Sequence, residues 1–501
     1  MATLFHNASV YDSTGRYLGD HVLVSSGRIV SLGKLGTPPL EGEWGLVDLG
    51  GRVVLPAFWD CHVHLVETGF ATLGPTLDSI STAEEFLACI RQSADTSHGE
   101  LVRVVGFDPA LLKDGLPTLD QLDEVCPGRP LLLQHVEGHA SWLNRRALAL
   151  VGLHSDHGFV RGAENAQARQ RLSGLISWQD RVRAITAAAG HLAGYGIAGV
   201  HAFEGGPLFH DADYDAVASL VHQLPLQVYL YHQVLDVDGP RARLARRAGG
   251  CVPLDGSSGV LTAAISEPYL GTTETGTLYY RQEEVDRFVE RAGQLCIQTS
   301  LHACGDRAIE QVLLAHQRYP SPGLRHRVEH IEVPAPGQLE RLAELGLVAS
   351  VQPAFDHFWG GDEGDYALTL GRARARRANP LGQLLRLAVP VVMGSDSPVT
   401  PANPLLTLQA AVTHRQPGER TGFWQALPLI TGRAAWAVHA GDERGDLASG
   451  KAADFVVFQQ PPWDVREMQH LRPWMTVVNG RVVYSAGELT GPGPGLFPLR
   501  R

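Results

Sequence analysis

The stretch GRVVLPAFWDCHVHL, Gly51 to Leu65, decides how the rest of the chain is interpreted. Its apolar run Val53–Leu55 predicts a buried strand, and Pro56, which has no backbone N–H to donate, ends the hydrogen-bonded ladder of that strand. His62 and His64 follow with one residue between them. Because alternate residues of an extended segment point to the same side, the two imidazoles are predicted to face a single metal ion.

The composition is that of a large, well-buried globular protein. The chain has 501 residues, of which 44% are hydrophobic and 19% charged, a length that suits an α/β barrel with additional segments. The net charge of −11 and the absence of a basic stripe argue against nucleic acid or a membrane surface as a partner. Neither a signal peptide nor a membrane-spanning run is apparent, and six cysteines form no CxxC pair. We therefore expect a cytoplasmic protein.

Short β-like segments at both ends of the chain predict one small sheet shared by the termini. Residues 1 to about 52 alternate such segments with turns, and the residues from about 440 onward do the same. Asn479-Gly480, between two valine-rich segments, is typical of a two-residue hairpin turn. We expect a small antiparallel β-sandwich built from residues 1–55 and 436–501.

Strand-like and helix-like segments alternate through the middle of the chain, which is typical of a parallel sheet. The number of repeats favours a closed (β/α)₈ TIM barrel over residues 56–435, with insertions at about 66–130 and 355–378. The second insertion is polar and glycine-rich, and we expect it to cover the mouth of the barrel. With the HxH strand there are nine candidates for eight places, so one is expected to lie in an insertion. The other eight candidate strands are residues 131–136, 196–203, 226–231, 259–265, 296–303, 326–331, 347–353 and 389–396.

Residues with metal-binding chemistry follow several of the predicted strands. His302, His330 and Asp396 each stand where an apolar strand gives way to a turn, the position at which barrel enzymes place their catalytic groups. Neutral imidazoles suit zinc, and a carboxylate can both ligate a metal and accept a proton from water. Each residue taken alone also fits a buried structural role, but their shared position favours a hydrolytic metal centre.

The order HxH, His, His and a final Asp on a barrel between two β-rich ends resembles the metal-dependent amidohydrolase superfamily. More narrowly, it resembles the YtcJ-like branch, which includes N-substituted formamide deformylases. The segments HVEGHASWLNRRAL, LHACGDRAIEQVL, RHRVEHIE and GSDSPVTPANPL carry this resemblance, which runs from about Gly51 to Gly487. It implies that His139 is a catalytic residue facing the substrate beside the metal. The metal ligands that it implies are His62, His64, His302, His330 and Asp396.

One departure from the family's pattern concerns the metal bridge. Related binuclear enzymes bridge two metals with a carboxylated lysine a few residues before the DG that is here Asp255-Gly256. The expected place holds Cys251, and a thiolate is a good zinc ligand. Cys251 therefore either replaces the bridge or is a small buried residue beside a mononuclear site. No lysine can occupy this position, because the chain has only Lys34, Lys113 and Lys451.

A second departure is Leu261, which stands where this branch usually has an arginine. The loss of that cation predicts a substrate less polar than is usual for the branch.

These features predict a hydrolase that holds one or two Zn²⁺ ions, or another divalent metal, and cleaves a non-peptide C–N bond. The expected substrate is a small amide, formamide or cyclic amide, and a homo-oligomer is possible. Asp396 is expected to pass a proton from water to the leaving nitrogen, and His139 to polarise the carbonyl group. The alternatives are a mononuclear deaminase, an esterase or lactonase at the same site, and a non-catalytic binding protein with this fold.

Overall fold

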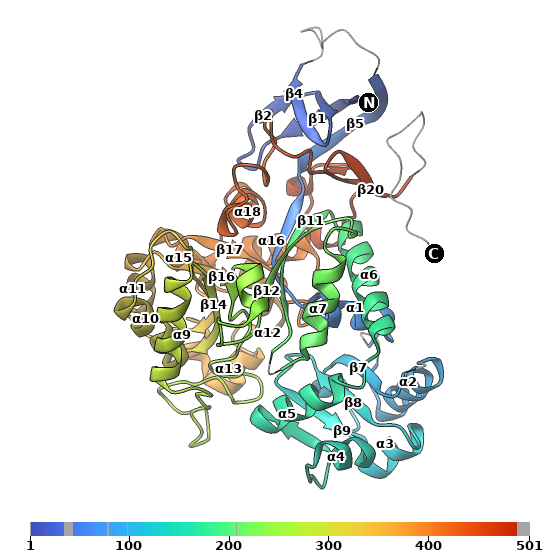
Figure 1. Ribbon diagram of the computed structural model, residues 1–501, viewed down its shortest axis with the longest axis vertical. Helices are drawn as coiled ribbons and strands as arrows, with labels where there is room; N and C mark the ends of the chain where they lie inside the picture. The colour runs from blue at the N-terminus through green and yellow to red at the C-terminus, as the bar shows by residue number, and fades with distance from the viewer. Residues whose placement is uncertain (1, 35–43, 78–79, 98, 207, 488–501) are drawn as a thin grey trace.

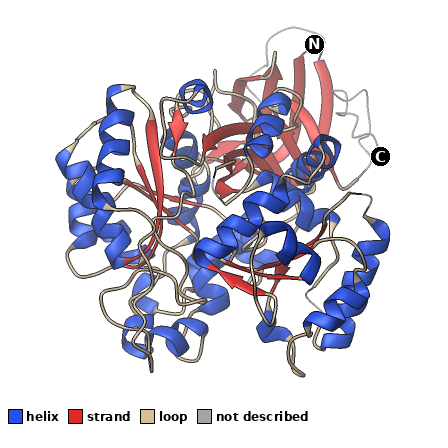
Figure 2. Ribbon diagram, turned by 60° about the horizontal axis from the view of Figure 1, so that its bottom comes forward, coloured by secondary structure: helices blue, strands red, loops and turns tan. Residues whose placement is uncertain are grey.

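Three sheets organise the chain in the computed structural model, which describes residues 2–34, 44–77, 80–97, 99–206 and 208–487 (Figure 1). One sheet of eight strands lies near both termini, an eight-stranded barrel lies in the centre, and a four-stranded sheet carries its own helices. Figure 2 shows helices around the barrel and the strands of the terminal sheet beside the labels N and C.

The central sheet is a parallel barrel in which each strand pairs with the next barrel strand along the chain. Its edges meet where the Asp396 N–H donates to the His62 carbonyl at 2.8 Å and the His64 N–H donates to the Ser397 carbonyl at 3.0 Å. The predicted (β/α)₈ fold is thereby confirmed. The strands are β6 (Phe58–Val63), β11 (Ile197–Glu204), β12 (Gln227–His232), β13 (Arg247–Ala248), β14 (Gln298–Gly305), β15 (Arg327–Val333), β16 (Val348–Val351) and β17 (Val391–Met393).

The helices outside the barrel are illustrated by α9 (Gln282–Gln294). Its Val285, Phe288, Val289 and Ala292 have the three- and four-residue spacing of one helix face and are all buried, so that face packs against the barrel core. The other helices of this layer and of the segment after β17 are α1 (Leu65–Leu73), α6 (Trp178–Gly194), α7 (Asp211–Leu220), α8 (Pro240–Ala245), α10 (Asp306–Arg318), α11 (Gln338–Glu344), α15 (Leu381–Arg386), α16 (Pro404–Thr413), α17 (Phe423–Ala426) and α18 (Gly432–Ala437).

Two of the nine predicted barrel strands are wrong. Residues 131–136 form β8 (Leu131–His135), which belongs to the four-stranded sheet, and residues 259–265 form turns in the loop between β13 and α9. The strand that the sequence analysis missed is β13, which is only two residues long and has no apolar run to mark it. An apolar run predicts a buried strand but does not say which sheet contains that strand.

The four-stranded sheet belongs to an insertion with its own hydrophobic core. Phe86 stacks on Phe107 at a ring separation of 4.2 Å, and Trp142 meets Phe107 edge-on at 5.2 Å. The sheet extends past residue 130, and the loop from β8 to β9 carries His139. Its elements are α2 (Ala83–Thr96), β7 (Val102–Phe107), α3 (Leu119–Val125), β8, β9 (Ala140–Leu143), α4 (Arg145–Val151), β10 (Phe159–Arg161) and α5 (Gly162–Ser173).

The segment predicted as a second insertion, residues 355–378, contains short helices. These are α12 (Pro353–Trp359), α13 (Asp365–Leu370) and α14 (Arg372–Ala375). Phe355, Trp359 and Tyr366 from this segment line a small cavity at the barrel mouth.

Both ends of the chain contribute strands to the terminal sheet, in the order β20-β19-β18-β5-β1-β3-β4, with β2 paired to β1. The antiparallel arrangement expected for this sheet is wrong at one place, since β1 and β5 are parallel. The hairpin at Asn479-Gly480 is confirmed, and both residues have positive φ, 49° and 70°. Residues 488–501 lie outside the described part. The strands are β1 (Ala2–Tyr11), β2 (Tyr17–Gly19), β3 (His21–Ser25), β4 (Arg28–Gly33), β5 (Trp44–Pro56), β18 (Phe455–Phe458), β19 (Met475–Val478) and β20 (Arg481–Ser485).

The stretch Gly51 to Leu65 joins two sheets. β5 ends at Pro56 in the terminal sheet and β6 begins at Phe58 in the barrel. Val53–Leu55 is thus the buried strand that was predicted, whereas the HxH pair belongs to the next strand, with His62 inside it and His64 just after it.

Candidate metal centre

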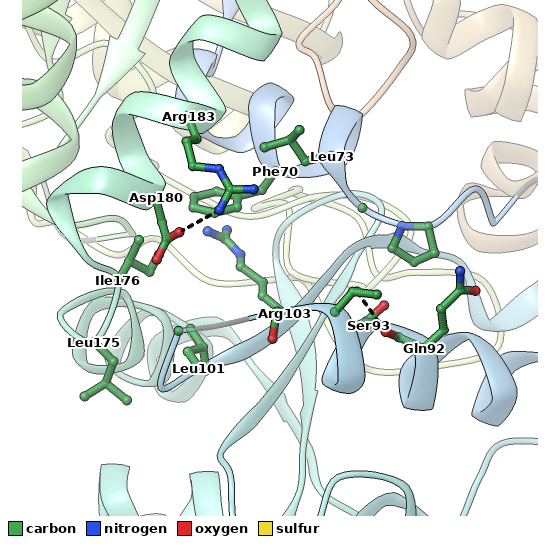
Figure 3. A pocket seen from close by; sticks show the side chains of 15 residues that line it. Phe70, Leu73, Gln92, Ser93, Leu101, Arg103, Leu175, Ile176, Asp180 and Arg183 are labelled. Carbon is green, nitrogen blue, oxygen red and sulfur yellow. Dashed lines mark hydrogen bonds and ion pairs between the residues drawn. The ribbon is translucent and has the colours of Figure 1, made fainter. Parts of the chain in front are cut away.

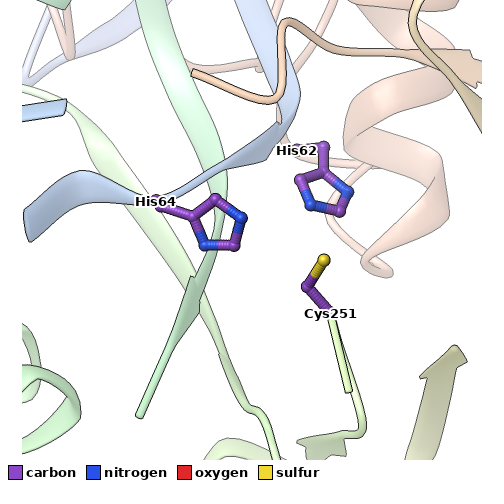
Figure 4. A group of neighbouring side chains, drawn as sticks. All are labelled: His62, His64 and Cys251. Atoms are coloured by element: carbon purple, nitrogen blue, oxygen red, sulfur yellow. The ribbon is translucent and has the colours of Figure 1, made fainter. Parts of the chain in front are cut away.

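Six of the predicted side chains meet at the carboxyl ends of the barrel strands. Their candidate donor atoms form three overlapping groups of three, and within each group the atoms lie within 4.8 Å of one another. Cys251, His62 and His330 each belong to two of these groups, and Figure 4 shows the Cys251 sulfur directed toward the rings of His62 and His64. The groups are His62, His64 and Cys251; Cys251, His302 and His330; and His62, His330 and Asp396.

Hydrogen bonds fix one nitrogen of each imidazole from β6. The His62 Nδ1 lies 2.8 Å from a carboxylate oxygen of Glu329, and the His64 Nδ1 lies 2.9 Å from the carbonyl oxygen of Phe203. Both partners are acceptors, so each Nδ1 carries the proton and each Nε2 is left with a lone pair for a metal.

The other two imidazoles are oriented in the same way from different strands. The His330 Nδ1 lies 2.9 Å from the amide oxygen of Gln352, which leaves its Nε2 for the centre. The His302 Nε2 lies 3.1 Å from the carbonyl oxygen of Gly256, so here Nδ1 is the free donor, and it faces the Cys251 sulfur at 3.5 Å. All four rings therefore direct a lone pair toward a common space.

Two buried polar atoms at this space have no hydrogen bond to any residue that the structure describes. They are the His62 Nε2 and the Asp396 Oδ1, which lie 3.2 Å apart. The same carboxylate oxygen lies 3.3 Å from the His64 Nε2. Buried polar atoms without partners are costly unless an ion satisfies them. Imidazole, thiol and carboxylate donors in this arrangement fit a divalent transition metal such as zinc.

The backbone is strained at two of these positions. His330 has φ 74° and Asp396 has φ 57°, a left-handed conformation that residues other than glycine seldom adopt. Such conformations persist only where the surrounding structure imposes them, and they are concentrated at functional sites.

Neighbouring charged groups set the ionisation of two buried carboxyl groups at the centre, those of Asp396 and Glu329. Burial raises the pKa of Asp396, but the neighbouring His62 and other imidazoles outweigh burial and leave that pKa below its usual value. Burial also acts on Glu329, where the guanidinium of Arg327, 2.8 Å away, lowers the pKa of the carboxyl well below normal. Asp396 and Glu329 are therefore carboxylates at neutral pH.

Replacing Arg327 with methionine is expected to destabilise the protein by about 3–5 kcal/mol, because it leaves the Glu329 charge buried without its partner. Thermal unfolding of the two proteins measures this. The matched control is Arg291→Met, which removes an ion pair with Asp238 whose side chains are 43% and 51% exposed and should change stability by less than about 1 kcal/mol. Equal shifts in the two variants would contradict the role given to the buried pair.

A fourth group of potential ligands, Asp255, His302 and Cys304, has its hydrogen-bonding capacity already satisfied. Asp255 accepts backbone N–H groups of Ala264, Cys304 and Gly305 at 2.8 to 3.0 Å. Burial raises the pKa of Asp255 to about 8. We therefore assign Asp255 to holding the loop after β13 against β14, and not to metal binding, while His302 belongs to the group with Cys251 and His330.

A small cavity of about 30 Å³ adjoins the predicted ligands. It offers room for roughly two water molecules, so a larger substrate must displace side chains around it. His139 lines it, with its ring centre 5.1 Å from that of His302. Burial, with the nearby Arg169, lowers the pKa of His139 to about 3, so the imidazole is neutral.

A larger cavity of about 440 Å³ lies between the barrel and the insertion, lined by residues of α1, α2, β7 and α6. Figure 3 shows Arg183 paired with Asp180 there, beside Arg103 and Phe70. None of the predicted site residues lines it. Since barrel enzymes place their chemistry at the carboxyl ends of the strands, we place the candidate site at the smaller cavity.

Several residues of the site escaped the sequence analysis. The orienting role of Glu329 was one, although it adjoins His330 in RHRVEHIE. Glu137, Glu332 and Tyr366, which line the cavity, were given no role there, because the segments that carry them are far apart in sequence. Leu261, taken as a sign of a less polar substrate, packs beside a hydrophobic cluster and is not among the residues that line the cavity.

A (β/α)₈ barrel with this donor set at its strand ends defines the class of barrel hydrolases that depend on a metal. The sequence profile of the amidohydrolase family matches residues 45–484. The chain therefore belongs to the amidohydrolase family, as its sequence motifs indicated.

Relatives and solved structures agree with this assignment. The chain is 26% identical to the putative amidohydrolase YtcJ of Bacillus subtilis over 97% of this chain and 99% of that protein. It is 27% identical to the N-substituted formamide deformylase of Arthrobacter pascens over 94% and 95% of the two chains. A metal-dependent hydrolase from Pyrococcus furiosus superposes with a TM-score of 0.75 at 26% identity, covering 92% of this chain and all of that one. No helix in the described ranges has the length and apolarity needed to cross a bilayer.

Proposed function

We propose that the protein hydrolyses a non-peptide C–N bond in a small amide, formamide or cyclic amide, with one or two zinc ions. The name of the Arthrobacter relative, an N-substituted formamide deformylase, supports this bond type. The ligands in this proposal are His62, His64, Cys251, His302, His330 and Asp396.

The observation that carries the proposal is the orientation of the imidazoles. Four rings from three strands each have one nitrogen held by an acceptor and the other directed to the same space. A binding protein that had lost its chemistry has no need of four such pairings.

A divalent metal bound here supplies a Lewis acid that lowers the pKa of water and polarises a carbonyl group. Asp396 accepts the proton that water gives up as its oxygen bonds to the carbonyl carbon. The same carboxyl group then donates that proton to the nitrogen as the C–N bond breaks, so that the products are an acid and an amine. His139, which is neutral, donates an N–H hydrogen bond to the carbonyl oxygen and orients the substrate.

The test is hydrolysis of a panel of amides, formamides, cyclic amides, esters and aminated heterocycles by protein stripped of metal and then reloaded with zinc. We expect turnover of N-substituted formamides or small amides only after reloading. Deamination of heterocycles without amide hydrolysis would favour the alternative that the protein is a deaminase. Less than one tightly bound metal per chain, with no turnover, would contradict the proposal.

Replacing His139 with alanine is expected to lower kcat about 100-fold, the lower end of the effect of losing one hydrogen-bond donor to a developing oxyanion. The metal content should not change, because His139 is in none of the donor groups. Steady-state kinetics and elemental analysis on the same preparation measure both. A loss of metal in this variant would show that His139 acts as a ligand.

A further inference from the structure

The cavity beside the predicted ligands contains carboxyl groups, and among the described residues that line it there is no lysine or arginine. Glu137 and Glu332 are among its lining residues. Glu137 accepts the Ser257 hydroxyl at 2.7 Å. Glu332 accepts the Tyr366 hydroxyl at 2.8 Å and the Cys304 thiol at 3.0 Å. All of these donors are neutral, and neither carboxyl forms an ion pair with a residue in the described ranges.

Aromatic rings form another part of the cavity wall. Trp359 and Phe355 from α12 lie 5.2 Å apart at an interplanar angle of 60°, and Tyr366 from α13 lines the same space. The faces of aromatic rings attract cations, and the attraction grows when water is excluded. Carboxylates beside aromatic faces are the chemistry that binds an ammonium group.

A separate observation shows that a ligand is expected in this space. The side chain of His139 lines the cavity, and the residue is only 9% exposed. Its ring has no hydrogen bond to any residue in the part of the chain that the structure describes. A polar ring that lines a cavity and has no protein partner can be satisfied by water or by a bound molecule.

We propose that the substrate carries an ammonium group, which Glu137 and Glu332 hold beside the rings of Trp359 and Tyr366 while the amide lies at the predicted metal centre. This inference rests on the proposed function and adds the substrate class to it. Glu137 and Glu332 both line this space, and an ammonium group offers them charge-assisted hydrogen bonds that a neutral substrate does not.

The pKa of Glu137 responds to the charges around this cavity. Burial raises its pKa to about 8, with a smaller contribution from the nearby Glu332 and against the lowering effect of the Ser257 hydrogen bond. A cation bound between Glu137 and Glu332 favours the charged form of Glu137 and therefore lowers its pKa.

The first experiment measures binding to the protein with its metal in place, by titration calorimetry with n-butylammonium and with its neutral analogue n-butanol. We expect the ammonium to bind at least about tenfold more tightly, because charge-assisted hydrogen bonds are stronger than neutral ones. Glu137→Gln and Glu332→Gln should each remove most of this difference. Glu283→Gln, a substitution on an exposed residue of α9, should not.

The variants separate this site from direct binding of the amine to the metal. An amine that binds the metal keeps its affinity in Glu137→Gln, and that result would overturn the inference. Equal binding of n-butanol and n-butylammonium to the unmodified protein would do the same. If Glu332→Gln fails to fold, as judged by circular dichroism, Glu137→Gln and Trp359→Leu still decide the question, since each should weaken ammonium binding.

The second experiment compares hydrolysis of N-(4-aminobutyl)formamide with that of N-pentylformamide, which has nearly the same shape without the charge. We expect a kcat/KM at least about tenfold higher for the charged substrate, and a ratio near one in Glu137→Gln. Preference for the neutral formamide would overturn the ammonium site and leave the proposed function standing. If neither these formamides nor any amide of the panel is hydrolysed by the metal-loaded protein while ammonium binding depends on Glu137, the proposed function fails and the site remains.

Discussion

Replacing Asp396 with asparagine is expected to lower kcat by about 10²–10⁴-fold, the range associated with loss of a general acid or base. Asparagine has the shape of aspartate and tolerates the left-handed backbone of this position, where φ is 57°. The amide group of asparagine cannot accept the proton of water at neutral pH. The fold should therefore persist while the proton transfer is lost, and steady-state kinetics on the best substrate of the panel measures the effect.

The matched control is Asp120→Asn, which makes the same chemical change at a side chain that is 86% exposed on α3. Its kcat should stay within about twofold, as expected for a surface substitution. Thermal unfolding of both variants shows whether either change disturbs the fold. Activity of Asp396→Asn above about a tenth of the unmodified level would show that another group transfers the proton.

Most of the barrel was predictable, because its strands are apolar runs followed by amphipathic helices. Seven of the nine candidate segments became barrel strands, including residues 196–203 and 326–331. Residues 131–136 are equally apolar and equally buried, but they pair within the insertion. Local patterning fixes whether a segment is extended and buried, whereas its choice of sheet depends on contacts distant in sequence.

The candidate ligands could be located from sequence because each lies in or after the carboxyl-terminal part of a strand, and the barrel brings strand ends together. The orientation of their side chains could not be predicted from the sequence. Glu329 holds His62 from the far side of the barrel, 267 residues away. Gln352 holds His330 from the next strand. The cavity wall could not be predicted for the same reason, since Glu137 from the loop after β8 and Tyr366 from α13 come together only after folding.

Replacing Cys251 with serine is expected to weaken binding of at least one metal ion by at least about 100-fold, since loss of outer-shell partners alone costs 10- to 100-fold. Serine keeps the size of the side chain but is a poor zinc ligand at neutral pH. Elemental analysis after dialysis measures the stoichiometry. In cobalt-loaded protein, the sulfur-to-metal charge-transfer absorption should be lost together with most of the activity.

Cys304→Ser is the control that makes this prediction specific. The two sulfurs lie at the same distance, 3.5 Å, from the two nitrogens of one imidazole, Cys251 at the Nδ1 of His302 and Cys304 at its Nε2. That Nε2 is already paired with the Gly256 carbonyl, and the Cys304 thiol donates to Glu332 at 3.0 Å, a bond that a serine hydroxyl can also make. Cys304→Ser should therefore retain the metal, the cobalt absorption and the activity. If both variants keep the full metal content, Cys251 is a packing residue beside a mononuclear site. If both lose it, the ion lies on the side of His302 that faces Cys304, and the ligand assignment is reversed.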